Sequence, residues 1–284
     1  MYSTGKKMNI TRLKFSNHWR GIAFGLWHSA DFDPEKLFAE YEKTFKSDSK
    51  VIVVLKTLRL SGRDIKVVIK RQARSLGIRD FFRSLMPGKA MRNCKMAMRL
   101  NENGVPAAKS IAAMQRKILF WTVESIYITE YIENSMSLYD IFFGKDPYAL
   151  KYWPRVKKQI VFETATLLAD LHNAGFWHRD SKAGNVLAYR NQSGDYKVKL
   201  IDLDGVKRYG ILRRRRTLQT LWKLSETLSR FCLVSETDFW RGFRTYCQRT
   251  GVKETKMRPL FYELKSLTVS KRLLTIASDA YKEI

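Results

Sequence analysis

Three side chains in the middle of the sequence have the chemistry that phosphoryl transfer to an alcohol requires. Asp180 and Asn185 lie in the run HRDSKAGN at 178–185, and Asp202 lies in LIDLD at 200–204. We expect Asp180 to orient an acceptor hydroxyl and to receive its proton. Asn185 and Asp202 would supply the hard oxygen ligands that Mg²⁺ prefers. The metal bridges the phosphate oxygens of a nucleotide, so these residues predict a kinase that uses a nucleotide and Mg²⁺.

The combination of these motifs is more informative than any one of them. Four fixed residue types at fixed spacing arise by chance on the order of once per 10⁵ positions. The Asp that follows two apolar residues downstream makes an accidental match improbable. His178 and Arg179 are expected to brace the loop, and His172 to be a packed or surface histidine.

Two lysines are expected to contact phosphate groups. Lys182 lies two residues after Asp180, from where it can offset the charge of the transferring phosphoryl group. Lys70 ends the apolar strand Val67-Val68-Ile69, where a cation can contact the phosphates of the nucleotide. The plainer alternatives are a solvated lysine at 182 and an ordinary strand-end lysine at 70.

Composition narrows the class of protein. The chain has 284 residues and a formal net charge of +26, which attracts nucleic acid, anionic membranes or phosphorylated substrates. Three cysteines without metal-ligand spacing indicate a reducing compartment. No apolar run approaches the ~18 residues that suggest a membrane-spanning helix. A cytoplasmic protein is therefore expected.

The elements expected around these residues divide the chain into a strand-rich part and a helical part. β-branched runs at 51–60 and 65–70 flank the turn signal at 61–64 and predict an antiparallel hairpin. The other expected elements are a helix at 89–101, strands at 118–122 and 125–131, a helix at 156–173, strands at 186–189 and 197–202, and helices from 219 onward. We predict an α+β fold with domains at 1–130 and 131–284.

Two motifs resemble one family. DSKAGNVL at 180–187 and LIDLDGV at 200–206 are similar to the bacterial lipopolysaccharide core kinases, which phosphorylate Kdo (3-deoxy-D-manno-octulosonic acid) or heptose. NGVP at 103–106 and ITEY at 128–131 fit the same family, and the resemblance covers about residues 45–230. It implies a two-lobed, protein-kinase-like fold with a small N-terminal antiparallel sheet plus helix and a larger, mostly helical C-terminal lobe.

The resemblance also implies roles for residues that bind the nucleotide. Lys70 would hold the α- and β-phosphates, and the main chain of Glu130, Tyr131 and Ile132 would contact adenine. Three features of protein kinases are missing. No Gly-rich loop precedes the first strand, where 45–50 reads FKSDSK; the helix at 89–101 holds no acid to pair with Lys70; and neither Asp-Phe-Gly nor Ala-Pro-Glu is present. These losses favour a small or lipid-linked acceptor.

A basic and apolar element follows the Asp202 motif. Arg213, Arg214, Arg215 and Arg216 precede a stripe of apolar residues at Leu218, Leu221, Trp222, Leu224, Leu228 and Phe231. We expect this element to face an anionic glycolipid at a membrane, since each cation near such a surface contributes about 1 kcal/mol. The alternative is that the stripe belongs to the core and the arginines form a solvated face.

The favoured interpretation is an ATP-dependent kinase of the lipopolysaccharide inner core, peripheral at the cytoplasmic face of the inner membrane. Its partners would be the core glycolipid and the anionic membrane surface. Other enzyme interpretations are a kinase for another small alcohol or an antibiotic, and an atypical protein kinase. Non-enzyme interpretations are a basic nucleic-acid-binding protein, which leaves Asp180, Asn185 and Asp202 unexplained, and a lipid-binding pseudokinase.

Overall fold

The computed structural model describes residues 10–24, 32–73, 88–119, 121–230 and 233–280. Two compact units emerge: Met1–Arg99 with Ala108–Tyr131, and Leu100–Ala107 with Ile132–Ile284. The expected α+β composition is confirmed, since the first unit contains an antiparallel sheet and the second is mostly helical. The division into domains at residue 130 stays a prediction.

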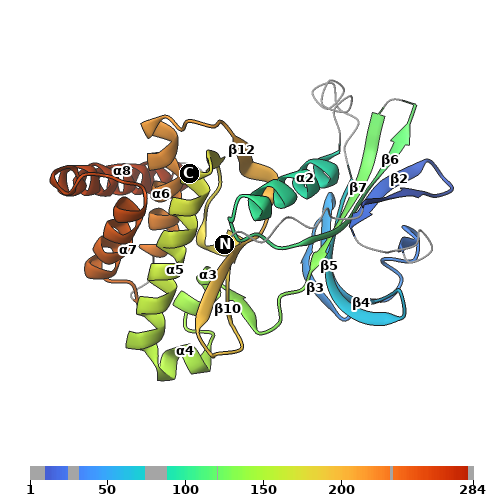
Figure 1. The fold of residues 1–284 in the computed structure, drawn as a ribbon, viewed down its shortest axis with the longest axis horizontal. Coiled ribbons are helices and arrows are strands. Elements are labelled where there is room, and N and C mark those ends of the chain that lie inside the picture. Colours follow the sequence, from blue (N-terminus) through green and yellow to red (C-terminus); the bar gives the residue numbers. More distant parts are fainter. Residues whose placement is uncertain (1–9, 25–31, 74–87, 120, 231–232, 281–284) are drawn as a thin grey trace, which may run out of the picture. The chain divides into compact units, whose positions relative to one another are not determined.

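The first unit is built on a seven-stranded antiparallel sheet, with the order β1-β2-β6-β7-β5-β4-β3 (Figure 1). Its strands are β1 (Ile10–Lys14), β2 (Trp19–Phe24), β3 (Lys43–Ser47), β4 (Val51–Leu60), β5 (Arg63–Ala73), β6 (Ser110–Ile118) and β7 (Trp121–Glu130). The predicted hairpin is confirmed: β4 pairs with β5, from Val51 opposite Gln72 to Leu60 opposite Arg63.

Alternation along the strands gives this sheet two packed faces. One face buries apolar side chains that include Val54, Val67 and Ile69. On the other face, helix α2 (Lys89–Glu102) packs Ala90 and Cys94 against Tyr127 of β7. The helix expected at 89–101 is therefore confirmed, and it covers the face of the sheet that carries Tyr127.

One predicted strand is wrong. The segment 118–122 is not one strand: Ile118 ends β6, Trp121 begins β7, and Leu119 has a positive φ of 53° and a side chain that is 81% exposed. The actual strand is β6, and its small residues Ala112 and Ala113 gave it little β-propensity in the sequence. The strand expected at 125–131 coincides with most of β7.

The second unit surrounds a long helix, α5 (Trp153–Asn173), which buries one side from Val156 to Leu171. The chain leaves α5 through Gly175, which has a φ of +76°. A Cβ there would lie 2.3 Å from the main-chain oxygen of Gly210, so both conformation and space require glycine. This end of α5 determines where the next strand, β9 (Phe176–His178), begins.

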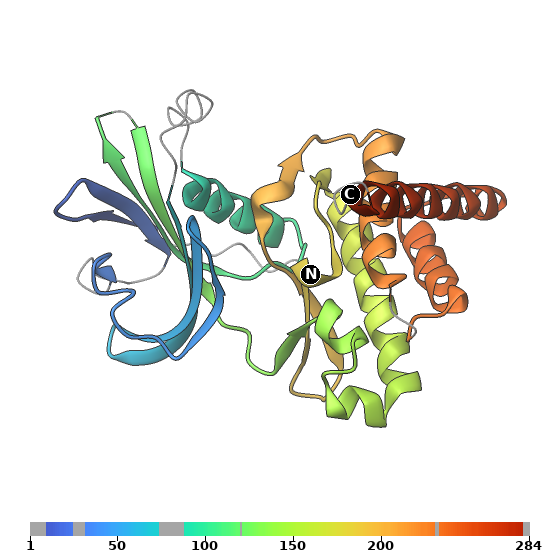
Figure 2. The same ribbon diagram turned by 180° about the vertical axis from the view of Figure 1, so that it is seen from behind.

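The rest of the second unit consists of short strands, two five-residue helices and three longer helices. Its other elements are β8 (Ser135–Ser137), α3 (Leu138–Phe142), α4 (Pro147–Lys151), β10 (Val186–Arg190), β11 (Tyr196–Leu200), β12 (Val206–Arg208), α6 (Arg214–Leu228), α7 (Glu236–Arg249) and α8 (Glu254–Ala280). Helix α7 packs on α5, and α8 lies beside α6 (Figure 2).

Two expectations for this unit need adjustment. Helix α6 begins at Arg214, five residues before the expected start at 219, so three arginines lie in its first turn. Strand β11 ends at Leu200, which leaves Asp202 beyond the strand. Among the described helices, none has both the length and the apolar character needed to span a membrane.

Candidate active site

The predicted catalytic loop connects β9 to β10 in the second unit. Within it, the side chains of Asp180 and Lys182 are 46% and 49% exposed, and Lys182 Nζ lies 3.3 Å from Asp180 Oδ2. The main-chain N–H of Asp180 donates to Nδ1 of His178 over 3.2 Å. An accessible carboxylate on a fixed main chain is what a substrate-orienting acid needs.

The two expected metal ligands are brought together by main-chain pairing. The N–H of Ile201 donates to the main-chain oxygen of Asn185 over 2.9 Å, which places Asp202 next to Asn185. Asn185 Nδ2 donates to the main-chain oxygen of Asp180 over 2.7 Å, so its amide oxygen points away from that carbonyl. Asp202 adopts the left-handed conformation, with a φ of 53°, directly after β11.

A further segment ties the Asp202 motif to the catalytic loop. Strand β12 pairs with β9, and the N–H of Arg179 donates to the main-chain oxygen of Gly205 over 3.0 Å. A Cβ on Gly205 would lie 3.2 Å from His178 Nδ1 and 3.3 Å from the nitrogen of Asp180. This close approach explains why glycine follows the second aspartate of the LIDLDG motif.

His178 braces the loop, as the sequence suggested, and does so as a neutral side chain. It is fully buried. Burial lowers its pKa to about 4, although the carboxylates of Asp202 and Asp180 oppose that shift. Because Nδ1 accepts the hydrogen of the Asp180 N–H, the ring carries its own hydrogen on Nε2. His172 is also buried, and its Nδ1 lies 2.8 Å from the hydroxyl of Tyr246.

The donor set suits magnesium that is shared with a nucleotide. In the described part of the chain, no group of three or more His, Cys, Asp or Glu side chains could hold a metal alone. One amide oxygen from Asn185 and carboxylate oxygens from Asp202 are hard ligands that would leave coordination positions for phosphates and water. Mg²⁺ in kinases is usually bound in this way.

Lys70 lies in the first unit, on β5, with Tyr127 of β7 directly across. Residues opposite each other in an antiparallel pair share a face, so Lys70 lies on the face that α2 covers. The residues of α2 from Lys89 to Asn101 include no acid. The helix thus differs from that of protein kinases, which carries an acid that pairs with the strand lysine, as the sequence indicated.

Several main-chain groups of the segment expected to contact adenine already form hydrogen bonds within the protein. The N–H of Glu130 donates to the main-chain oxygen of Lys109 over 3.0 Å. The N–H of Tyr131 donates to the main-chain oxygen of Lys66 over 3.1 Å. The main-chain oxygen of Ile132 accepts from Ser135 Oγ over 2.6 Å. A nucleotide base would have to use other main-chain groups of this segment.

The segment that stands in place of a Gly-rich loop is a hairpin turn. Residues 45–50 run from β3 into β4, and Asp48 Oδ1 accepts from the N–H groups of Lys50 and Val51 over 2.9 and 2.7 Å. The bonds from Lys46, Lys50 and Val51 hold the pKa of Asp48 at about 2. A side chain thus builds the turn that glycines build in protein kinases.

Sequence reasoning missed a buried carboxylate in the first unit. Glu124 of β7 is 3% exposed, is bonded by Arg71 Nε and lies 3.1 Å from Arg116 Nη2. It joins three neighbouring strands, because Arg71 belongs to β5 and Arg116 to β6. An acid inside an apolar strand pattern, with arginines in the flanking strands, was the available signal.

The basic segment, defined as residues 207–216, contains six cations and no acid. Its apolar tip is Ile211, which is 92% exposed. Arg214 pairs with Glu263 of α8, and the guanidinium of Arg216 lies 3.6 Å from the ring centroid of Tyr209. The expectation that the following apolar stripe faces a glycolipid is wrong for its leucines: Leu218, Leu221, Leu224 and Leu228 are buried in the core. Trp222 is half-buried, and Phe231 lies outside the described residues.

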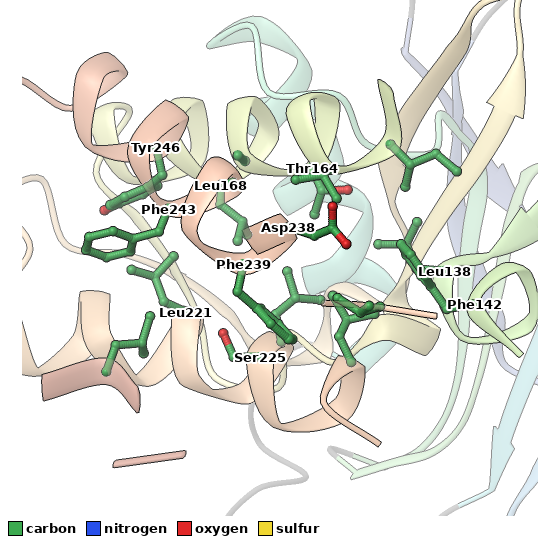
Figure 3. A pocket seen from close by; sticks show the side chains of 18 of the residues that line it. Leu138, Phe142, Thr164, Leu168, Leu221, Ser225, Asp238, Phe239, Phe243 and Tyr246 are labelled. Carbon is green, nitrogen blue, oxygen red and sulfur yellow. The ribbon is translucent and has the colours of Figure 1, made fainter. Parts of the chain in front are cut away.

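A cavity lies between the helices of the second unit (Figure 3). It is a mainly apolar cavity of about 90 Å³, lined by residues of α3, α5, α6, α7 and α8. Asp238 lies at its edge and is held by Lys157 Nζ at 2.7 Å. A more open groove of about 490 Å³ adjoins it, and Lys158, Arg241 and Arg244 line this groove.

Comparison with known proteins identifies the family. One similar solved structure is "WaaP in complex with acyl carrier protein", with 20% identity, coverage of 84% of this chain and 92% of that chain, and a TM-score of 0.60. The BubR1 kinase domain is similar at 13% identity, over 95% of this chain and 86% of that chain, with a TM-score of 0.49. No curated protein matches the sequence.

The likeness to WaaP confirms the expected kinase-like fold. The model of the lipopolysaccharide kinase (Kdo/WaaP) family matches residues 51–246, which is more than half of the chain. The expected activity, phosphorylation of a sugar of the lipopolysaccharide core, follows from this match. The chain belongs to the lipopolysaccharide kinase (Kdo/WaaP) family.

Proposed function

We propose that Asp180, Lys182, Asn185 and Asp202 carry out the transfer of the γ-phosphoryl group of ATP to a hydroxyl of Kdo or heptose. The family gives the reaction class, a phosphotransferase acting on a sugar of the lipopolysaccharide core. The observation that supports the assignment of residues is the set of bonds around Asn185. Through Ile201 and Asp180, these bonds hold the acid and both metal ligands in one arrangement.

Asp180 accepts the hydrogen of the acceptor hydroxyl and fixes the direction of its oxygen. The hydroxyl oxygen forms a bond to the γ-phosphorus while the bond to the bridging oxygen breaks and ADP leaves. The hydroxyl proton passes to the carboxylate of Asp180 late in this step. Lys182, whose Nζ lies 3.3 Å from Asp180 Oδ2, offsets charge on the transferring group.

The remaining residues bind the nucleotide and its metal. Asn185 and Asp202 hold Mg²⁺, which when bound neutralises phosphate oxygens. Lys70 contacts the α- and β-phosphates, and the segment from Glu130 to Ile132 contacts adenine. Support for these last roles comes from the position of Lys70 on its strand and from the resemblance of the ITEY motif to the family.

A radiolabel assay tests the acceptor and the acid together. ATP labelled in the γ-phosphate is offered with deacylated core oligosaccharide, with proteins and with aminoglycosides. We expect label only in the oligosaccharide, and Asp180→Asn should lower kcat by about 10²- to 10⁴-fold. The Kd for nucleotide should not change.

Asp170→Asn is the matched control, because Asp170 is a surface acid whose Oδ1 pairs with Arg249 Nη2 at 2.8 Å. It should keep the kcat of the wild type. Label confined to a protein band would overturn the sugar assignment, and normal turnover in the Asp180 variant would remove Asp180 from its role.

The basic segment supports a peripheral position at an anionic membrane. Arg213 and Arg215 are exposed at the start of α6, and Lys207 and Arg208 are exposed on β12. Together with the protruding Ile211, they present positive charge around one apolar side chain. Each cation near an anionic leaflet contributes about 1 kcal/mol, so this surface suffices for reversible docking.

Vesicle binding tests this docking. Vesicles of phosphatidylcholine with phosphatidylglycerol should bind the protein, whereas pure phosphatidylcholine should not. Changing Arg213 and Arg215 to Gln should weaken binding by about 30-fold, from the loss of two charges. The control changes Arg59 and Arg63 to Gln at the exposed β4–β5 turn. Equal weakening by both pairs would show that net charge alone is responsible.

A second proposal concerns a partner protein. The similar structure of WaaP was solved with acyl carrier protein. In the present chain, the apolar cavity suits the end of an acyl chain, and the adjoining groove places Arg241, Arg244 and Lys158 where a phosphate of a carrier arm could bind. We therefore propose that the second unit also binds an acylated carrier.

Calorimetry with acylated and unacylated acyl carrier protein tests this second proposal. The acylated form should bind more tightly, and changing Arg241 and Arg244 to Glu should abolish binding of both forms. The pair Arg59 and Arg63 changed to Glu is the charge-matched control. Identical affinities for the two carrier forms would exclude the cavity as the site of the acyl chain.

A further inference from the structure

The catalytic loop is attached to helix α6 by three hydrogen bonds that bracket Asp180 and Lys182. Ser181 Oγ donates to the main-chain oxygen of Thr220 over 2.7 Å. Thr220 Oγ1 donates to the main-chain oxygen of His178 over 3.2 Å. The N–H of Ala183 donates to Thr227 Oγ1 over 3.0 Å. No other described helix makes hydrogen bonds of this kind to these three residues.

The two threonines have different capacities for this role. Thr227 Oγ1 gives its own hydrogen to the helix, to the main-chain oxygen of Leu224 at 2.9 Å or Lys223 at 3.1 Å, so its lone pairs are available for Ala183. The single hydroxyl hydrogen of Thr220 is shared between two acceptors. These are the main-chain oxygens of His178, at 3.2 Å, and of Arg216, at 3.3 Å. The bond from Ala183 to Thr227 is therefore the stronger restraint.

The attached residues are buried, whereas the residues between them are not. His178, Ser181 and Ala183 have no exposed surface. Asp180 and Lys182 alternate with them and extend toward solvent with nearly half of each side chain exposed. The position of Asp180 and Lys182 therefore depends on the main chain that α6 holds.

We propose that Thr227, supported by Thr220, is a positioning residue for the phosphoryl transfer step, an inference that rests on the proposed roles of Asp180 and Lys182. The threonines act through the main chain of the loop and touch neither substrate. Loss of the Thr227 hydroxyl leaves the N–H of Ala183 without its acceptor in a buried place. The loop then shifts to satisfy this group, and Asp180 moves with it.

Kinetics of Thr227→Val test the inference, because valine keeps the shape of threonine and lacks only the hydroxyl. A displacement of about 1 Å can lower a rate by about 10²-fold, so we expect kcat to fall by about 10- to 100-fold. The KM values for ATP and for the oligosaccharide should stay within about twofold, because the binding groups remain. Thr220→Val should show a smaller loss, and Thr227→Ser should restore kcat.

Thr166→Val is the matched control. Thr166 is a half-buried threonine on α5, as Thr227 is on α6, and its Oγ1 has no hydrogen-bond partner in the described part of the chain. This variant should keep the wild-type kcat. If Thr227→Val folds poorly, Ser181→Ala replaces it. This variant removes the hydrogen bond to Thr220, another of the three bonds, and its kcat is compared with that of the wild type in the same way.

The outcomes separate the inference from the function on which it rests. If Asp180→Asn abolishes transfer while Thr227→Val and Ser181→Ala keep the wild-type kcat, the positioning role is wrong and the catalytic assignment stands. If Thr227→Ser fails to restore kcat, the hydroxyl is not what positions the loop. If Asp180→Asn retains turnover, the catalytic assignment itself fails.

Discussion

The catalytic loop and the basic segment are neighbours in the sequence, but their side chains are held in different ways. From His178 to Gly205, every residue assigned to chemistry lies beside a main-chain hydrogen bond with a defined partner. In the basic segment, Arg213 and Arg215 extend into solvent from the start of a helix whose first turn has no acid and no side-chain cap. Positive charge there opposes the helix dipole.

The difference separates two kinds of recognition. A reacting group has to be placed within fractions of an ångström, which requires directional bonds and buried supports. A charged surface attracts an anionic partner at longer range and tolerates mobile side chains. The number and sign of its charges therefore matter more than the direction in which each side chain points. We therefore expect single changes to disable the loop, and the basic segment to respond gradually to charge and salt.

Beyond the Asp180 variant, the largest expected effect comes from Asp202→Asn. Replacing the carboxylate with a neutral amide removes one negative charge from the metal site, and we expect kcat/KM to fall by about 10²- to 10³-fold. Raising the Mg²⁺ concentration should recover part of the loss, as a Mg²⁺ titration of the rate would show. A loss that does not depend on Mg²⁺ would mean that Asp202 acts without holding the metal.

Gly205→Ala should have the next largest effect. Its Cβ would meet His178 Nδ1 at 3.2 Å and the nitrogen of Asp180 at 3.3 Å, so the loop has to move. Overpacking of this kind costs about 1–3 kcal/mol of stability. We expect a lower unfolding temperature together with reduced turnover.

Gly184→Ala is the stability control for Gly205→Ala, because a Cβ there meets nothing within 4 Å. Thermal unfolding of the two variants and of the wild type makes the comparison. Similar unfolding temperatures for Gly205→Ala and the wild type would show that the two motifs pack less closely than the structure indicates.

In the unmodified protein, salt should affect the basic segment and the catalytic loop differently. The Debye length falls from about 10 Å at 0.1 M to about 3 Å at 1 M salt, so binding to anionic vesicles should weaken by at least about tenfold. At saturating ATP and soluble oligosaccharide, kcat should change by less than about twofold. Parallel loss of vesicle binding and kcat would contradict the distinction between the two regions.

The last expected effect is on the pH dependence of stability. Burial lowers the pKa of both His172 and His178 from 6.5 to about 4. Between pH 6.5 and 4 the unfolded chain therefore binds protons that the folded chain does not bind, and the free energy of unfolding decreases as the pH falls. Each histidine contributes at most about 1.4 kcal/mol per pH unit.

His172→Gln should reduce this slope by the share of one histidine. Unfolding by denaturant at several pH values between 4 and 7 measures it. An unchanged slope would mean that His172 titrates normally in the folded protein.

The sequence was most informative where local patterns determine the outcome. The loop from His178 to Asn185, the helix before it and the hairpin around Ser61 could be predicted, because turn residues and hydrophobic periodicity act over short distances. The helix that buries Leu221 and Leu224 could be predicted as a helix, but its apolar side was assigned to a membrane. Only tertiary packing decides whether such a stripe faces the core.

The missed supports share one property: their partners are distant in the sequence. Thr227 meets Ala183 across 44 residues, and Arg71 meets Glu124 across 53 residues. A threonine inside a helix has no local pattern that identifies such a partner, and an acid inside an apolar strand indicates a partner without showing which arginine it is. The strand β6 was not predicted for a different reason: it contains alanines, which have little preference for strands.

The short stretch Leu100–Ala107 has a consequence for dissecting this kinase. It precedes the last two strands of the first unit, yet it is grouped with the second, where Val105 is fully buried and the oxygen of Pro106 accepts from the N–H of Leu200 over 2.9 Å. A fragment that starts at Ile132 would therefore lack part of its own interior. During synthesis on the ribosome, these eight residues emerge long before β11, so that portion of the protein cannot finish folding until nearly a hundred more residues have been added.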